Sequence, residues 1–60
     1  MIDTDLERAN SAVFKTKQAL KGAARAFERL GESAHADRIY RICDDLDGVI
    51  AAGAEMEARA

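Results

Sequence analysis

The residues that could do chemistry in this 60-residue chain are few, and most stand alone. His35 is the only histidine and Cys43 the only cysteine, so an internal disulfide is impossible and a cysteine and histidine zinc site would lack ligands. Neither residue has a partner at a spacing that indicates a catalytic triad. We therefore expect His35 to lie at the end of a helical bundle and Cys43 to be a small core residue.

An acidic cluster, Asp44, Asp45 and Asp47, is the other candidate for chemistry, as a cation site. It lacks the glycine and the later glutamate of an EF-hand calcium loop, and the Glu-x-x-His motif of di-iron bundles is absent. The four glycines are scattered, so the chain has no phosphate-binding glycine loop. The sequence therefore predicts a non-enzymatic protein that uses no metal or cofactor, with these acids on a solvated helix face.

The elements that must position these residues are helices. The chain has no proline, two phenylalanines and one tyrosine, a composition that favours helix over sheet. The run Thr-Asp-Leu-Glu from Thr4 fits a capping box and predicts a first helix over about residues 5–30. Gly31 suits a left-handed helix C-cap, and Ser33 can begin a second helix that ends near residue 58.

The connection, about residues 31–33, is too short for anything but folding back. The sequence therefore predicts a single all-α domain over residues 1–60, an antiparallel two-helix hairpin. Three glycines fall inside the predicted helices, where each costs about 1 kcal/mol relative to alanine. We interpret them as weak points or close-contact sites: Gly22, Gly48 and Gly53.

Apolar spacing predicts which helix faces meet. In the first helix one row repeats every seven residues, and the row three positions further on is mostly small: Leu6, Val13, Leu20 and Phe27, then Ala9, Thr16, Ala23 and Leu30. In the second helix the apolar stripe is wider than one neighbouring helix can cover. We expect that stripe to form a dimer or partner interface through Ile39, Ile42, Leu46, Val49, Ile50 and Met56.

Chain length favours association as well. A domain of 60 residues hides only about 60% of the surface of its unfolded chain. Small domains usually need disulfides, a structural metal or oligomerisation for stability, and the first two are already excluded here. We expect a homodimer that forms a four-helix bundle with a two-fold axis. No apolar run approaches the roughly 20 residues of a membrane span, and the N-terminus is acidic, so a cytoplasmic protein that stays out of the membrane is expected.

Charge separates between the two helices. Five basic residues and no acid lie between Glu7 and Glu28, whereas five acids and no base lie between Arg41 and Arg59. One interpretation is that a basic helix lies beside an acidic one and sets the antiparallel pairing. The other is that the first helix meets an anionic partner. One strip of this helix combines an aromatic ring with amides and bases, a set that can bind RNA: Asn10, Phe14, Gln18, Lys21 and Arg25.

The same strip resembles a known family over about twenty residues. Asn10, Ala12, Phe14, Gln18 and Leu20 are similar, without a gap, to the first helix of the Rop family of small plasmid proteins. Arg25 stands where that family carries a lysine. Rop proteins are dimeric four-helix bundles of two helical hairpins that bind paired RNA hairpins. The resemblance therefore implies that fold, and implies that Asn10, Phe14, Gln18 and Arg25 face RNA.

A shorter segment, residues 42–50, resembles another family. Asp45, Leu46 and Asp47 are similar to the Glu-Leu-Asp part of the Ser-Gln-Glu-Leu-Asp segment in small hairpin phosphatases that act on sporulation response regulators. Cys43 and Asp44 stand in place of the serine and glutamine, so we do not expect phosphatase activity.

The function that we expect is that of a small regulator or adaptor, because recognition by a helix face needs no motif. Such a protein would bind itself and a further protein. RNA binding through the basic outer face of the first helix is one alternative. The other is a structural subunit of a larger helical assembly.

Overall fold

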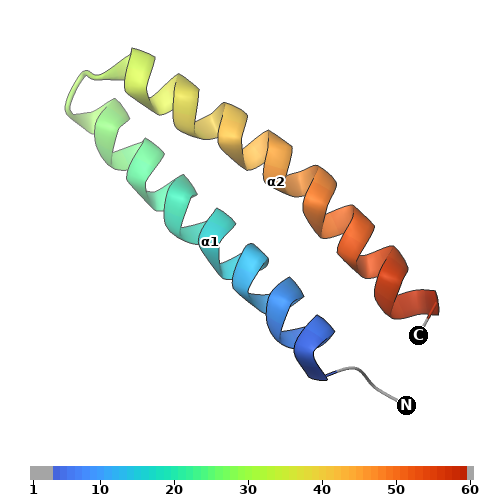
Figure 1. Cartoon of the computed structure of the whole chain (residues 1–60). Coiled ribbons are helices and arrows are strands. Elements are labelled where there is room, and N and C mark those ends of the chain that lie inside the picture. Colours follow the sequence, from blue (N-terminus) through green and yellow to red (C-terminus); the bar gives the residue numbers. More distant parts are fainter. Residues whose placement is uncertain (1–3, 60) are drawn as a thin grey trace.

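The structure is a computed structural model that describes residues 4–59. Within them the chain forms two helices, α1 (Thr4–Arg29) and α2 (Ser33–Arg59). Figure 1 shows the two helices running antiparallel and side by side along their length. The prediction of an all-α, antiparallel two-helix hairpin is confirmed. Over the described residues, neither helix is long and apolar enough to cross a membrane.

The turn is built by the C-cap that the sequence predicts. Gly31 has a φ of 81°, which places it in the left-handed region that glycine adopts without steric cost. The Glu32 amide donates to the Phe27 carbonyl at 2.8 Å and the Gly31 amide donates to the Glu28 carbonyl at 3.0 Å. This pair of bonds is the Schellman motif, which satisfies the last carbonyls of α1 and reverses the chain into α2.

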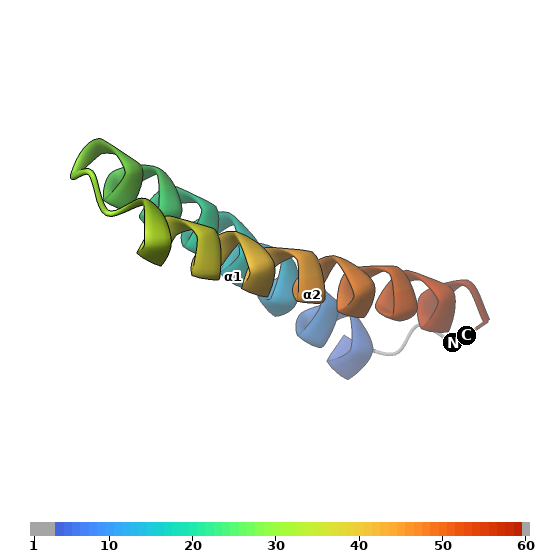
Figure 2. The ribbon, with the colours of Figure 1, turned by 90° about the horizontal axis from the view of Figure 1, so that it is seen from above.

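The hairpin is a single layer of two helices. Its Cα atoms span 48 × 15 × 10 Å, and Figure 2 shows α2 crossing α1 at a shallow angle, with no third element on either side. Because the described residues form one layer, no other element covers either broad face of the hairpin. Helices normally bury their apolar stripe between packed layers, which a single layer does not provide.

Small residues line the contact between the helices. The residues buried within the described part of the chain are Ala24 in α1 and Ala36, Cys43 and Gly53 in α2. No large side chain in that part is fully buried. The predicted core position of Cys43 is confirmed, because only 3% of its surface is exposed. The hairpin by itself thus has a close helix contact but almost no hydrophobic core.

The α1 row that contacts α2 differs from the one that the heptad spacing indicated. Of the predicted row, Ala9, Thr16 and Leu30 are exposed, Leu30 to 73%, and only Ala23 is half-buried. The row four positions after each heptad residue is covered instead: Asn10, Lys17 and Ala24. With 3.6 residues per turn, the rows three and four positions on flank the heptad row on opposite sides. The prediction that the row from Ala9 to Leu30 completes the seam inside the hairpin is therefore wrong.

Candidate interaction faces of the hairpin

Two cross-helix contacts mark one broad face of the hairpin. Lys17 of α1 forms an ion pair with Asp47 of α2, and the Tyr40 hydroxyl of α2 donates to Glu28 of α1. At about 100° per residue, Lys17 and Glu28 project to one side of the buried Ala24, and these contacts carry Asp47 and Tyr40 to that same side. We call this the polar face, defined by Lys17, Lys21, Arg25, Glu28, Tyr40 and Asp47.

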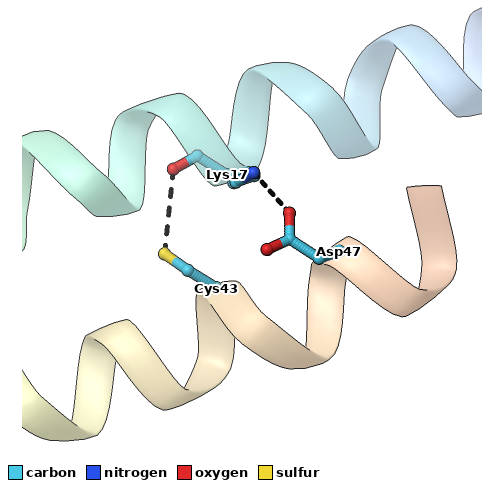
Figure 3. A network of polar contacts seen from close by, with 3 residues as sticks. All are labelled: Lys17, Cys43 and Asp47. Carbon is cyan, nitrogen blue, oxygen red and sulfur yellow. Dashed lines mark hydrogen bonds and ion pairs between the residues drawn. The ribbon is translucent and has the colours of Figure 1, made fainter. Parts of the chain in front are cut away.

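The Lys17 and Asp47 pair sits at the edge of the helix contact. Figure 3 shows the Lys17 side chain directed at Asp47 and the Cys43 sulfur directed at the Lys17 carbonyl, at 3.9 Å. The Lys17 side chain is only 16% exposed and that of Asp47 is 52% exposed. This ion pair supports the interpretation that opposite charges align the two helices, although a partly exposed pair contributes at most about 1 kcal/mol.

The Tyr40 contact changes the acidity of the phenol. The hydrogen bond to the Glu28 carboxylate is the first cause that raises the pKa of Tyr40 above its ordinary value of 10.0, with desolvation and the negative charge of Glu28 adding to it. Arg25 opposes the shift. Tyr40 therefore makes a contact within the hairpin.

A polar contact also joins the helices near their far ends. The Asn10 amide nitrogen donates to the Gly53 carbonyl at 3.1 Å and to Glu57 Oε1 at 2.7 Å. A Cβ atom at residue 53 would lie 2.8 Å from Asn10 Cγ, closer than real Cβ atoms come. Gly53 is therefore a close-contact site, as the sequence analysis allowed, and Asn10 fixes which residues of the two helices lie opposite each other.

The candidate RNA-binding residues lie along α1 on the polar side. Phe14 is 51% exposed, Gln18 and Arg25 are exposed, and Lys21 is half-buried. Asn10 differs from the rest, because its amide is already bonded to α2. Acids of the hairpin also border this strip, since Glu28, Asp47 and Glu57 make the contacts described above. The structure thus gathers an aromatic ring and cations, but carboxylates stand beside them.

The opposite broad face is apolar. Three α2 side chains spaced seven residues apart stand about half exposed: Ile42 at 47%, Val49 at 50% and Met56 at 48%. Beside them Ile39, Leu46 and Ile50 are half-buried. From α1, Val13, Leu20 and Phe27 border the same face, also half-buried. The six α2 residues are the predicted interface residues, and the hairpin leaves three of them largely uncovered.

We call this surface the apolar face and define it by these residues: Val13, Leu20, Phe27, Ile39, Ile42, Leu46, Val49 and Met56. On its α1 half, small residues flank the heptad row: Ala9 and Thr16, which are exposed, and Ala23, which is half-buried. We call these three the small row. At the turn end of the face, Phe27, His35, Arg38 and Ile39 line a shallow hollow. The Phe27 and His35 rings meet there edge to face, with centroids 5.5 Å apart.

The side chains that the sequence singled out as candidates for chemistry lie apart within the described residues. No three histidine, cysteine or acidic side chains among residues 4–59 come together as metal ligands would. Asp44 and Asp45 are exposed, and Asp47 is paired with Lys17. His35 contacts Phe27 in the first turn of α2. The features that stand out are therefore surfaces.

Sequence reasoning missed the cross-helix polar contacts, although the turn position carries a signal for them. An antiparallel hairpin folded at Gly31 places residues equally distant from the turn beside each other, as Asn10 and Gly53 are. Comparisons with protein-family models, with curated proteins and with solved structures give no match for this chain. What the structure establishes is the antiparallel two-helix hairpin.

Proposed function

We propose that this protein is a non-enzymatic regulator or adaptor that works by helix-mediated protein binding through its apolar face. The first partner is a second copy of the chain, in a homodimeric four-helix bundle. The observation that carries the proposal is the exposed row of Ile42, Val49 and Met56 beside a helix contact lined with small residues. Contiguous apolar surface of this kind marks sites where proteins associate.

Surface area supports the same proposal. A compact monomer of 6.5 kDa exposes about 3,800 Å², whereas this hairpin exposes 4618 Å². The excess of roughly 800 Å² equals what each partner contributes to an interface of standard size. A hairpin that covers its apolar face with a partner would thus reach the exposure that is normal for folded proteins.

The test replaces Val49, on the apolar face, by lysine and compares it with Ala51→Lys. Ala51 is exposed on the same helix and projects toward the polar side. In a dimer Val49→Lys buries two charges, each costing at least about 1 kcal/mol, so association should weaken at least about thirty-fold. Ala51→Lys should leave it unchanged. Light scattering behind a sizing column, with circular dichroism for helicity, measures both.

The same column run with total cellular RNA distinguishes the proposed function from the two alternatives. Uptake of RNA at low salt that is lost at high salt and in Phe14→Ala would replace protein binding by RNA binding as the function. A particle larger than a dimer would favour the structural subunit. Equal association by Val49→Lys and wild type would show that the apolar face is not the interface.

A further inference from the structure

We propose that the second copy docks on the apolar face in one orientation, with each α1 stacked on the partner's α2 and both turns at the same end of the bundle. This proposal rests on the proposed homodimer and specifies its geometry. Two hairpins stacked face to face about a two-fold axis have only two arrangements. Either α1 covers the partner's α2 with the turns together, or each helix covers its own copy with the turns at opposite ends.

Side-chain size distinguishes these arrangements. The outward-facing residues on the α2 half of the apolar face are large, Ile42 and Val49, whereas the α1 half carries the small row of Ala9, Thr16 and Ala23. With the turns together, large residues of each chain meet small residues of the other, which is how packed helix layers interdigitate. With the turns apart, large residues meet large ones and small residues meet small ones.

The heights of these residues along the bundle also agree. Asn10 lies beside Gly53, and Phe27 lies beside His35. Interpolation between these contacts places Val49 level with about residue 14 and Ile42 level with about residue 20. A two-fold axis along the bundle preserves height, so Val49 of one copy falls between Ala12 and Thr16 of the other, and Ile42 falls between Ala19 and Ala23. Each large side chain therefore meets a gap between small ones.

Helix charge favours the same arrangement. The α1 helix carries six basic and three acidic residues, and α2 carries three basic and six acidic ones. With the turns together, each net positive helix covers a net negative one. With the turns apart, like charges stack on like charges, which costs free energy and disfavours that arrangement. Net charge and side-chain size therefore both disfavour the arrangement with the turns apart.

One pair of residues localises the charge effect. Lys15 and Asp45 are both exposed, make no hydrogen bond or ion pair within residues 4–59, and lie on the outer sides of their helices, away from the contact between α1 and α2. With the turns together, Lys15 of each copy comes within reach of Asp45 of the other. With the turns apart, Lys15 meets the second Lys15 and Asp45 meets the second Asp45.

The experiment measures the distance between spin labels at the two turns. Glu32→Cys is labelled in a Cys43→Ala background, so that each chain carries one label. With the turns together the labels should lie within about 20 Å, because stacked helices are about 10 Å apart. With the turns apart they should lie at least about 40 Å apart, which is the length of a helix. A label at Asp44→Cys, halfway along α2, is the matched control, since both arrangements keep it at a similar separation.

Charge reversal gives an independent reading. Lys15→Glu and Asp45→Lys should each weaken the dimer by roughly two- to tenfold, and the double variant should restore it. Long turn-to-turn distances, or single reversals that leave association unchanged, would overturn the orientation while the homodimer stands. A wild-type chain that stays monomeric at every concentration would instead refute the homodimer, and the orientation with it.

Discussion

Alanine substitution at the helical glycines tests the Asn10 contact. Replacing a glycine inside a helix by alanine raises the free energy of unfolding by about 1 kcal/mol. A Cβ atom at residue 22 or 48 would meet nothing within 4 Å, so Gly22→Ala and Gly48→Ala should each gain that amount, which raises Tm by about 4–8 °C. At Gly53 the added Cβ overlaps the Asn10 side chain, so the gain should be lost.

The size of that loss follows from the hydrogen bonds of Asn10. Its side chain must turn away and give up the bonds to the Gly53 carbonyl and to Glu57. A partly buried bond is worth about 1 kcal/mol and an exposed one less. Gly53→Ala should therefore be neutral or up to about 1 kcal/mol less stable than wild type, and about 1–2 kcal/mol less stable than Gly48→Ala.

Urea and thermal unfolding followed by circular dichroism, at one protein concentration, measure these differences. An Asn10→Ala background supplies the control, because Gly53→Ala should regain most of the helix stabilisation there. A Gly53→Ala variant whose Tm rises as much as that of Gly48→Ala in the wild-type background would contradict the clash with Asn10. An Asn10→Ala background that left the effect of Gly53→Ala unchanged would contradict it as well.

Three further predictions concern the turn, the phenol and the association. Gly31→Ala should destabilise the protein by about 1–2 kcal/mol in urea unfolding, since its φ of 81° is costly for any residue with a Cβ; an unchanged midpoint would contradict the C-cap. The raised pKa of Tyr40 means that its stabilising contact is fully present below pH 10.0 and is lost as pH rises through the pKa of the folded protein. Because Tyr40 is the only tyrosine, phenolate absorbance reports this titration directly, and Glu28→Ala should move the pKa back toward 10.0; an unmoved pKa would show that Glu28 is not the cause. For a dimer that unfolds as it dissociates, Tm should rise by roughly 6 °C for a tenfold increase in concentration, given an unfolding enthalpy of about 0.7 kcal/mol per residue, and a constant Tm would indicate a stable isolated hairpin.

The fold could be predicted because its signals are local. Gly31 marks the only strong break in a chain without proline, and a short turn between two long helices leaves one topology. The apolar excess of α2 was also visible, since Ile42 and Val49 exceed what one neighbouring helix covers. These features depend on spacing along one helix, which sequence shows directly.

The seam of α1 could not be predicted, because it depends on how the helices cross. Either the row three positions after the heptad row or the row four positions after it can contact the second helix. Residue type favoured Ala9 and Thr16 as contact residues over Asn10 and Lys17. In the structure Asn10 and Lys17 face α2 instead. Each has a partner on α2 at its own height, Gly53 for Asn10 and Asp47 for Lys17. Distance from Gly31 indicates which residues lie at the same height, but which row of α1 faces α2 depends on how the two helices cross, and the pattern of one helix does not show that.

The choice of that row explains why the apolar face exists. By closing α1 on Asn10, Lys17 and Ala24, the hairpin turns the small row outward and leaves Ile42 and Val49 half exposed. The alternative closure would have separated Asn10 and Lys17 from Gly53 and Asp47, their partners on α2. The hairpin thus pairs Asn10 and Lys17 internally and leaves an apolar face that the proposed dimer would cover. Folding and association should therefore be one coupled process, and a substitution on the apolar face should lower helicity as well as affinity.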